Sequence, residues 1–323
     1  MRTSTPPAYR YIESGEQPFM MRRTLLYLSE RHWLRHWMEH SSVSRKLTSR
    51  FIAGRTLGEG IRVLQNLSSE RIWGTLDFLG EKVESLEDAL RSRESYLAAL
   101  AEIEHAHLPA TVSIKLSQFG LDLSEAACRN NVTALLDRAK AMGTRIEIDM
   151  ESSEYTDRTL AMVTALHEQY PGHVRAVIQA YLYRSEADIG TLSGRGVPVR
   201  LCKGAYREPP TVAFARKTDV DANYVKLMTL LLSAGTYPAI ASHDESIIRE
   251  ALRHTKEQKI PPERFEFQML YGIRRDLQRE LVSRGFHLRL YVPYGDAWYP
   301  YFMRRLAERP ANVLFLAKNL LRS

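Results

Sequence analysis

The sequence has little cysteine and no long apolar run, and both absences narrow the class of protein. Its 323 residues include two cysteines, Cys128 and Cys202, too few for a disulfide framework and typical of a reducing compartment. No window offers the ~20 uninterrupted apolar residues of a membrane-spanning helix. The N-terminus lacks the apolar core of a secretory signal. We therefore predict a cytoplasmic chain that does not cross a membrane.

Glycine-rich nucleotide motifs and a broad basic surface are also missing. No Gly-x-Gly-x-x-Gly segment follows a predicted strand, so a Rossmann site is not expected, and the glycines of Gly190–Gly196 are predicted to form a turn. The net charge is +7, but residues 1–60 hold ten Lys and Arg against five Glu, which leaves +2 for the rest. Without a basic stripe in the body of the chain, nucleic-acid binding is not expected.

From about residue 72 the chain alternates short β-branched runs with longer amphipathic stretches. Eight strands and eight βα units in ~250 residues predict a closed (β/α)8 barrel of the TIM type. A doubly wound sheet is the alternative, although it usually has fewer strands in this length. The expected strands are Ile72–Phe78, Ala110–Leu116, Arg145–Met150, Val174–Ala180, Val197–Lys203, Pro238–Ser242, Arg264–Leu270 and Phe286–Val292.

The ends of the chain do not follow this alternation. Residues 1–71 are predicted to form an N-terminal arm and helical cap, with helices over Arg22–His40 and roughly Val43–Leu67. The barrel is assigned to residues 72–311, and residues 312–323 are expected to form a C-terminal amphipathic helix. His32, His36 and His40 share one helical face, but a single face rarely supplies the three or four converging ligands of a zinc site, so no metal is expected.

Almost every expected strand ends in charged or polar side chains. In a barrel of this class the chemistry lies at the carboxyl ends of the strands. A charged side chain in an apolar strand needs a partner or a function. Structural salt bridges could explain one or two of these residues, whereas a polar residue at so many ends favours a site.

The last predicted helix carries a second signal. Pro300 suits a first helical turn, where its missing N–H costs nothing. Arg304 and Arg305 could form a fork for a carboxylate, and Glu308 is placed to orient either one. The alternative is an ordinary solvated Arg/Glu face.

Together these motifs resemble the proline dehydrogenase family, the flavoenzymes that begin proline catabolism. The resemblance extends from Ala110 to Arg309, and the short form resembles the monofunctional bacterial members. Its most specific parts are Arg200–Tyr206, Gln268–Gly272 and the ending Tyr291, Tyr301, Arg304, Arg305 and Glu308. It implies a distorted (β/α)8 barrel, with non-covalent FAD across its carboxyl end and the eighth helix over the barrel mouth.

The resemblance also implies residue roles. Arg304, Arg305 and Lys115 would bind the proline carboxylate, and Leu270, Tyr291 and Tyr301 would wall the ring. Asp149 and Glu308 would position the cationic groups, and Tyr206 would close the pocket. The residues implied to contact FAD are Met150, Gln179, Arg200, Lys203, Gly204, Ala205, His243 and Gln268.

The implied reaction is oxidation of L-proline to Δ1-pyrroline-5-carboxylate by hydride transfer to flavin N5. Electrons would pass to a quinone, with transient contact at the inner face of the membrane through the N-terminal or C-terminal helix. A separate pyrroline-5-carboxylate dehydrogenase would complete the conversion to glutamate. Two alternatives stay open: a Schiff-base (class I) aldolase or lyase that uses Lys115 or Lys203, and a basic protein that docks on membranes or nucleic acid.

Overall fold

The computed structural model describes residues 48, 50–80 and 83–308. The chain divides into two units, Ser49–Trp298, which holds the barrel, and Met1–Thr48 joined with Tyr299–Ser323. The helices expected over Arg22–His40 and within residues 312–323 lie outside the described residues, as do His32, His36 and His40. In the described part of the chain, no helix is long and apolar enough to cross a membrane.

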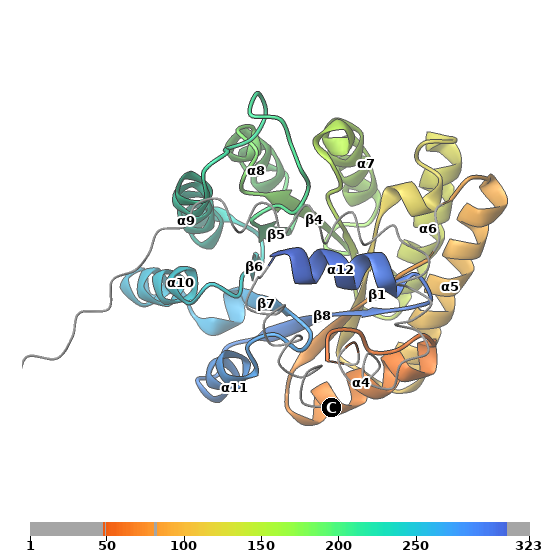
Figure 1. The fold of residues 1–323 in the computed structure, drawn as a ribbon, viewed down its shortest axis with the longest axis horizontal. Coiled ribbons are helices and arrows are strands. Elements are labelled where there is room, and N and C mark those ends of the chain that lie inside the picture. Colours follow the sequence, from red (N-terminus) through yellow and green to blue (C-terminus); the bar gives the residue numbers. More distant parts are fainter. Residues whose placement is uncertain (1–47, 49, 81–82, 309–323) are drawn as a thin grey trace, which may run out of the picture. The chain divides into compact units, whose positions relative to one another are not determined.

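The predicted closed barrel is confirmed, with eight parallel strands that pair in sequence order and β1 pairing with β8 (Figure 1). All eight expected strands are present, most of them shorter than predicted. They are β1 Trp73–Phe78, β2 Ala110–Ile114, β3 Ile146–Ile148, β4 Val174–Gln179, β5 Val199–Cys202, β6 Ala239–Ala241, β7 Glu266–Leu270 and β8 Leu288–Tyr294.

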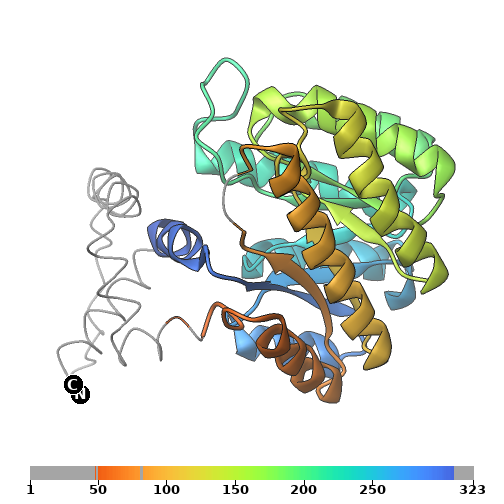
Figure 2. The ribbon, with the colours of Figure 1, turned by 90° about the vertical axis from the view of Figure 1, so that its right-hand side faces the viewer.

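Helices connect the strands along the outside of the barrel, as the side view shows (Figure 2). They are α4 Leu57–Ser69, α5 Leu86–His105, α6 Glu125–Ala141, α7 Thr156–Gln169, α8 Ser185–Gly194, α9 Lys217–Ala234, α10 Glu245–Glu257 and α11 Arg275–Ser283, with short 3-10 helices Leu116–Phe119, Ser153–Tyr155 and Pro262–Arg264. The chain then enters α12, Trp298–Glu308, which has Pro300 in its first turn as predicted.

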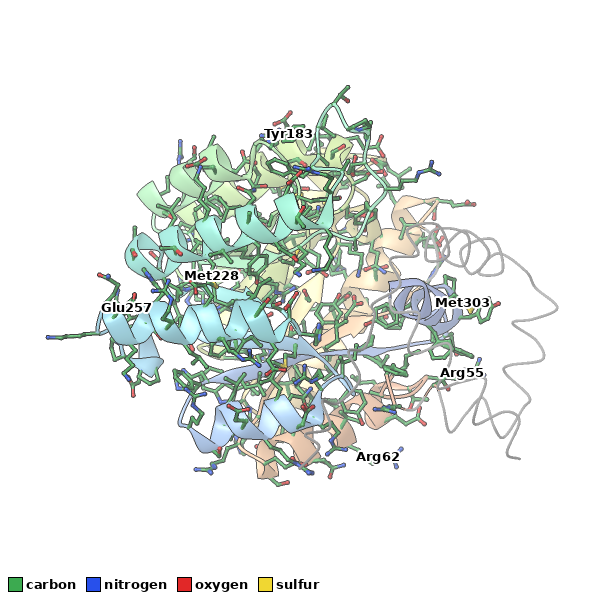
Figure 3. All side chains as sticks on the ribbon, turned by 60° about the vertical axis from the view of Figure 1, so that its left-hand side comes forward. Arg55, Arg62, Tyr183, Met228, Glu257 and Met303 are labelled. Carbon is green, nitrogen blue, oxygen red and sulfur yellow. The ribbon has the colours of Figure 1, made fainter. Side chains whose placement is uncertain are left out.

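The helices bury one face against the strands and leave the other face in water. On α9, Met228 is fully buried beneath the helix, whereas Glu257 at the end of α10 is exposed (Figure 3). Local signals fix the helix starts: Ser85 and Asp88 form a capping box at α5, and Thr56 and Glu59 form one at α4.

Two local predictions about helices are wrong. The expected helix Val43–Leu67 is not continuous, because residues 50–56 are not helical and the capping box at Thr56 starts α4 at Leu57; residues 43–47 and 49 lie outside the described part of the chain. The glycines Gly190 and Gly194 lie inside α8, and only Gly196, with φ +72°, makes the turn before β5. Apolar neighbours Ile189 and Leu192 pack on the barrel core and hold α8 helical despite its glycines.

The barrel departs from a regular one at α4, which packs against β1 and β8. Gly74 of β1 permits the contact, since a Cβ there would lie 2.0 Å from Leu64 Cδ2. A regular barrel would use the helix after β8 at this position. Because α4 takes it, the distortion expected from the sequence has a physical origin in the segment before the first strand.

Candidate active site at the barrel mouth

Polar side chains from strands that are not neighbours meet inside the barrel. Arg200 of β5 reaches Ser113 of β2, with Nη1 3.2 Å from Oγ, although β3 and β4 separate the two strands. Such a contact requires that both side chains point inward, because the helices cover the outer face. The interior is therefore polar where barrels of this class are usually filled with Val, Ile and Leu.

Asp149 follows β3 directly and joins residues from three other strands. Its Oδ1 accepts hydrogen bonds from Ser113 Oγ and Arg200 Nη1, each at 2.7 Å. Its Oδ2 accepts one from the Tyr291 hydroxyl of β8 at 2.8 Å. The Arg200 guanidinium also lies 5.6 Å from the centre of the Tyr291 ring, within range of a cation–π interaction. Three predicted site residues, Asp149, Arg200 and Tyr291, thus form one bonded group.

Lys115, which follows β2, lies between two carboxylates. Its Nζ is 2.8 Å from Asp77 Oδ1 and 3.8 Å from Asp149 Oδ2. Burial would lower the pKa of Lys115, but Asp77 and Asp149, with a smaller contribution from Tyr206, raise it above its usual value. Lys115 therefore carries a positive charge at neutral pH. A Schiff-base lyase needs a neutral lysine amine, so the state of Lys115 is unfavourable to that alternative.

A second ion cluster lies at the ends of β5 and β6. Lys203 Nζ is 2.5 Å from Asp221 Oδ1 of α9 and 2.8 Å from Asp244 Oδ2. Asp244 is also the N-cap of α10. Burial opposes ionisation of Asp244, but Lys203 and Ser246 lower the pKa of this carboxyl well below its usual value. Lys203 is thereby held at the mouth by two ionised partners.

Of the amide and imidazole side chains that the resemblance implies for the site, Gln179 and His243 are at strand ends, whereas Gln268 is in the middle of β7. Gln179 Nε2 donates to the Glu151 carbonyl at 2.8 Å, and Gln268 Nε2 contacts Glu266 Oε1 at 2.6 Å. His243 Nε2 accepts a hydrogen bond from the Leu270 backbone N–H at 2.7 Å, which links the ends of β6 and β7. Met150, after β3, is buried.

The loop after β5 carries three further predicted residues. Gly204 has φ +111°, and a Cβ there would lie 2.3 Å from Tyr181 Cδ1, so a side chain at this position would collide with the ring. Ala205 is exposed, and Tyr206 is 41% exposed. Cys202 lies at the end of β5, and burial raises the pKa of its thiol to about 12.

The remaining predicted residues, Tyr301, Arg304, Arg305 and Glu308, lie on α12. Their helix is confirmed. Because Tyr299 and the residues after it belong to the second unit, the position of this helix over the barrel mouth stays a prediction.

Two carboxylates at the strand ends, Asp77 and Asp221, are not among the predicted site residues. Asp77 is a lone carboxylate in the apolar strand β1, and the rule applied to the other strand ends would have found it. Asp221 lies in the first turns of α9, whose N-cap is Arg216, and it pairs with Lys203 and Lys217.

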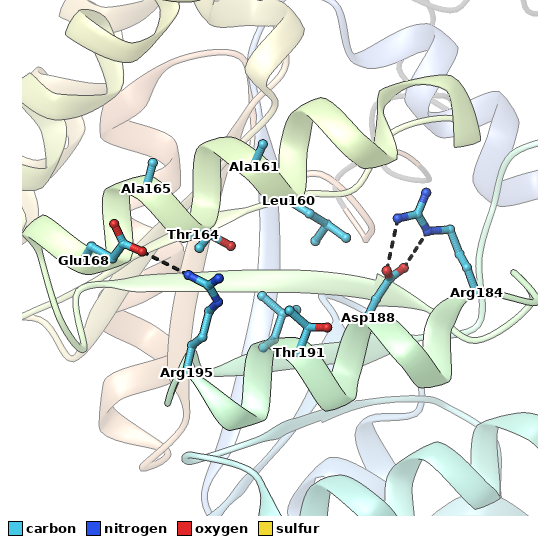
Figure 4. Close-up of a pocket in the computed structure, with 10 residues that line it drawn as sticks. Leu160, Ala161, Thr164, Ala165, Glu168, Arg184, Asp188, Thr191 and Arg195 are labelled. Atoms are coloured by element: carbon cyan, nitrogen blue, oxygen red, sulfur yellow. Dashed lines mark hydrogen bonds and ion pairs between the residues drawn. The ribbon is translucent and has the colours of Figure 1, made fainter.

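A groove of about 440 Å³ lies away from this chemistry, between α7 and α8 on the outside of the barrel (Figure 4). Its charged residues are already paired, Arg195 with Glu168 at 3.0 Å and Arg184 with Asp188 at 2.8 Å. We therefore assign the site to the strand ends.

Known proteins of one family match most of this chain. The family model described as Proline dehydrogenase matches residues 61–318. Proline dehydrogenase 2 of Bacillus subtilis (strain 168) is 40% identical over 295 residues, which cover 91% of this chain and 97% of the relative. Proline dehydrogenase of Deinococcus radiodurans is 39% identical over 280 residues, which cover 85% of this chain and 90% of the relative.

A solved structure shows the same fold. The proline utilization A (PutA) structure from Bdellovibrio bacteriovorus, inactivated by N-propargylglycine, aligns with a TM-score of 0.77 at 24% identity. The alignment covers 89% of this chain and 36% of that chain, so this protein spans about a third of that structure's length. On the strength of its sequence relatives and the family match, this chain belongs to the proline dehydrogenase family.

Proposed function

We propose that this protein catalyses the FAD-dependent oxidation of L-proline to Δ1-pyrroline-5-carboxylate, the first step of proline catabolism. The observation that carries the proposal is the group formed by Lys115, Asp149, Arg200 and Tyr291 at the strand ends, in a chain of this family. This group offers fixed positive charge for a carboxylate and a half-buried aromatic wall for an apolar ring.

The residues at the strand ends fit a flavin nucleotide. Arg200 and Lys203 supply two cations, and such charges favour an anionic reduced flavin or a pyrophosphate. Arg200 Nε is buried and has no hydrogen-bond partner among the described residues, so it has a donor to offer. Gly204, next to Lys203, packs against the Tyr181 ring, and this contact keeps the loop that carries Lys203 close to the end of β5. Met150, Gln179, Ala205, His243 and Gln268 would complete the FAD site.

The chain's own residues would bind and orient the substrate. Lys115 would hold the proline carboxylate together with Arg304 and Arg305, which Glu308 would position. Leu270, Tyr291 and Tyr301 would enclose the ring, and Tyr206 would close the pocket.

The chemistry that FAD supplies when bound is acceptance of the C5 hydride. We assign the proton of the ring nitrogen to solvent, so the rate should rise with pH as the amine is deprotonated. Asp149 keeps Arg200, Ser113 and Tyr291 in place during the reaction.

We further propose a membrane quinone as electron acceptor and a separate pyrroline-5-carboxylate dehydrogenase as the enzyme that uses the product. A basic helix with aromatic residues can lie in the interface of anionic lipid. The expected N-terminal helix with Trp33 and Trp37 has that composition. Co-sedimentation with anionic and neutral vesicles, at low and high salt, would test this contact. Equal binding to both lipids would contradict it.

The deciding experiment is the visible spectrum of the purified protein, followed by anaerobic addition of L-proline. We expect flavin absorbance that is bleached by proline, with pyrroline-5-carboxylate formed in equal amount. Lys115→Met should lose most of this response, whereas Lys226→Met, which removes an exposed lysine paired with Glu186, should keep it. A colourless protein, or flavin that proline does not reduce, would refute the proposal.

A further inference from the structure

A layer of buried charge lies inside the barrel beneath the proposed site. Arg175 Nη1 is 2.6 Å from Glu266 Oε1 and 3.3 Å from Glu147 Oε1. Arg289 Nε is 3.0 Å from Glu266 Oε1 and 3.7 Å from Glu147 Oε1. These four residues come from β3, β4, β7 and β8, and the side chains are at most 6% exposed. We call them the buried charge layer.

Burying charge in a barrel is costly, and apolar side chains could fill the same space. A purely structural role does not require the layer to contact the site above it. Here it does, because Glu147 Oε2 also accepts a hydrogen bond from Arg200 Nη2. Glu147 is therefore the member that joins the buried charge layer to the group around Asp149.

Glu147 is held firmly and stays ionised. Thr111 Oγ1 donates to its Oε1 at 3.1 Å, and Gln268 Nε2 lies 3.2 Å from its Oε2. Burial alone would raise the pKa of Glu147, but Arg200, Arg175 and Arg289 together hold it well below its usual value. Its charge is thus constant over the pH range in which an enzyme of this kind would work.

Arg200 is consequently clamped between two carboxylates. Glu147 holds Nη2 from the layer beneath, and Asp149 holds Nη1 at 2.7 Å at the mouth. Asp149 in turn holds the Tyr291 hydroxyl. A change at Glu147 would therefore pass through Arg200 to Asp149 and Tyr291, although the Glu147 side chain is fully buried and does not reach the mouth.

We propose that Glu147 is a positioning residue, which sets the orientation and the effective charge of Arg200 at the proposed flavin and proline site. This inference rests on the proposed function. Without Glu147, Arg200 would lose its closest counter-charge and the electrostatic potential at the mouth would become more positive. A more positive potential favours an anionic reduced flavin, so the midpoint potential of the bound flavin would rise.

The layer allows a test in which total charge does not change. In Glu147→Gln/Arg175→Met one carboxylate and one guanidinium are removed, leaving Arg289 with Glu266 and Arg200 with Asp149. In the matched control Glu266→Gln/Arg175→Met the same groups are removed from the same layer, but the Glu147–Arg200 contact is kept, and an amide oxygen at position 266 still accepts a hydrogen bond from Gln268 Nε2. Because charge stays balanced in both, each variant should fold, which a melting curve would verify.

Two readouts separate positioning from stability. The first is the midpoint potential of the bound flavin, measured by dye-coupled reduction without substrate. The second is kcat for proline, which should fall about tenfold to a hundredfold in Glu147→Gln/Arg175→Met, the range for loss of a charged hydrogen bond. We expect a positive shift in potential and a reduced kcat only in this variant, with the control near wild type in both.

Equal shifts in the two double variants, or no shift in either, would overturn the role of Glu147. A wild-type protein without flavin or proline oxidation would instead refute the proposed function, and the inference with it. The wild-type spectrum thus decides the function, and the comparison of the two variants decides the role of Glu147.

Discussion

Asp77→Asn tests how the site keeps Lys115 in place. The substitution preserves shape, so no cavity forms, but it removes the charge 2.8 Å from Lys115 Nζ. Loss of a charged hydrogen bond costs about 1.5–3 kcal/mol. Removing the buried charge of Asp77 does not compensate for this loss of stability. Asp77 Oδ2 has no hydrogen-bond partner among the described residues, so an amide N–H at the same place would be unpaired as well. We expect the free energy of unfolding to fall by about 2 kcal/mol.

The pH dependence follows from Lys115. Asp77 and Asp149 raise the pKa of Lys115 in the folded state, despite its burial. A raised lysine pKa contributes stability that is complete below the unfolded pKa of about 10.4 and is lost only as pH rises through the folded value. The difference in the free energy of unfolding between wild type and Asp77→Asn should therefore be constant from pH 7 to pH 9, and it should become smaller only at higher pH.

Denaturant unfolding at several pH values would measure this difference, and steady-state kinetics would show a raised KM for proline. The control is Glu168→Gln, which removes a carboxylate 3.0 Å from Arg195 on the outer surface. Exposed pairs contribute about 0–1 kcal/mol, so this variant should stay near wild type. Two results would contradict the role of Asp77 in holding Lys115. One is an Asp77→Asn variant as stable as Glu168→Gln, and the other is a loss in its free energy of unfolding that varies between pH 7 and pH 9.

Three further predictions concern the proposed cofactor and substrate sites. Acid precipitation should release all the flavin into the supernatant, and flavin that stays in the pellet would exclude non-covalent binding. Arg304→Met or Arg305→Met should weaken the binding of a proline-like carboxylate inhibitor about tenfold to a hundredfold while flavin content is kept. Unchanged affinity would contradict carboxylate binding by the two arginines. Gly204→Ala should lower flavin content and melting temperature, because its Cβ meets the Tyr181 ring, whereas Gly143→Ala, also at positive φ but with open space around it, should keep its flavin.

The fold could be predicted because its signals are local. Each β-branched run forms a strand, and most of the connections that contain glycine or proline form turns. Two helix predictions failed for different reasons. Packing of Ile189 and Leu192 keeps α8 helical at Gly190, where a turn was expected. The capping box at Thr56 starts α4 later than the apolar pattern suggested.

The position of the candidate site could also be predicted, since parallel strands bring their carboxyl ends to one edge. Lys115, Asp149, Arg200 and Tyr291 were identified from the sequence, and the structure brings them together. The sequence marks Asp77 as a charged residue in an apolar strand, but it does not show that Lys115, 38 residues later, lies beside it.

The sequence by itself determined the number and order of strands, the polar strand ends and the family, because these depend on residue types at fixed spacing. The tertiary structure alone decided the partners. Arg175 and Glu266 are 91 residues apart and meet only because the barrel closes. Closure also gives Glu147 its contact with Arg200 and gives α4 its place on β1 and β8. Long-range ion pairs leave no periodic trace in a sequence, since their energy depends on distance and burial, which exist only in the folded chain.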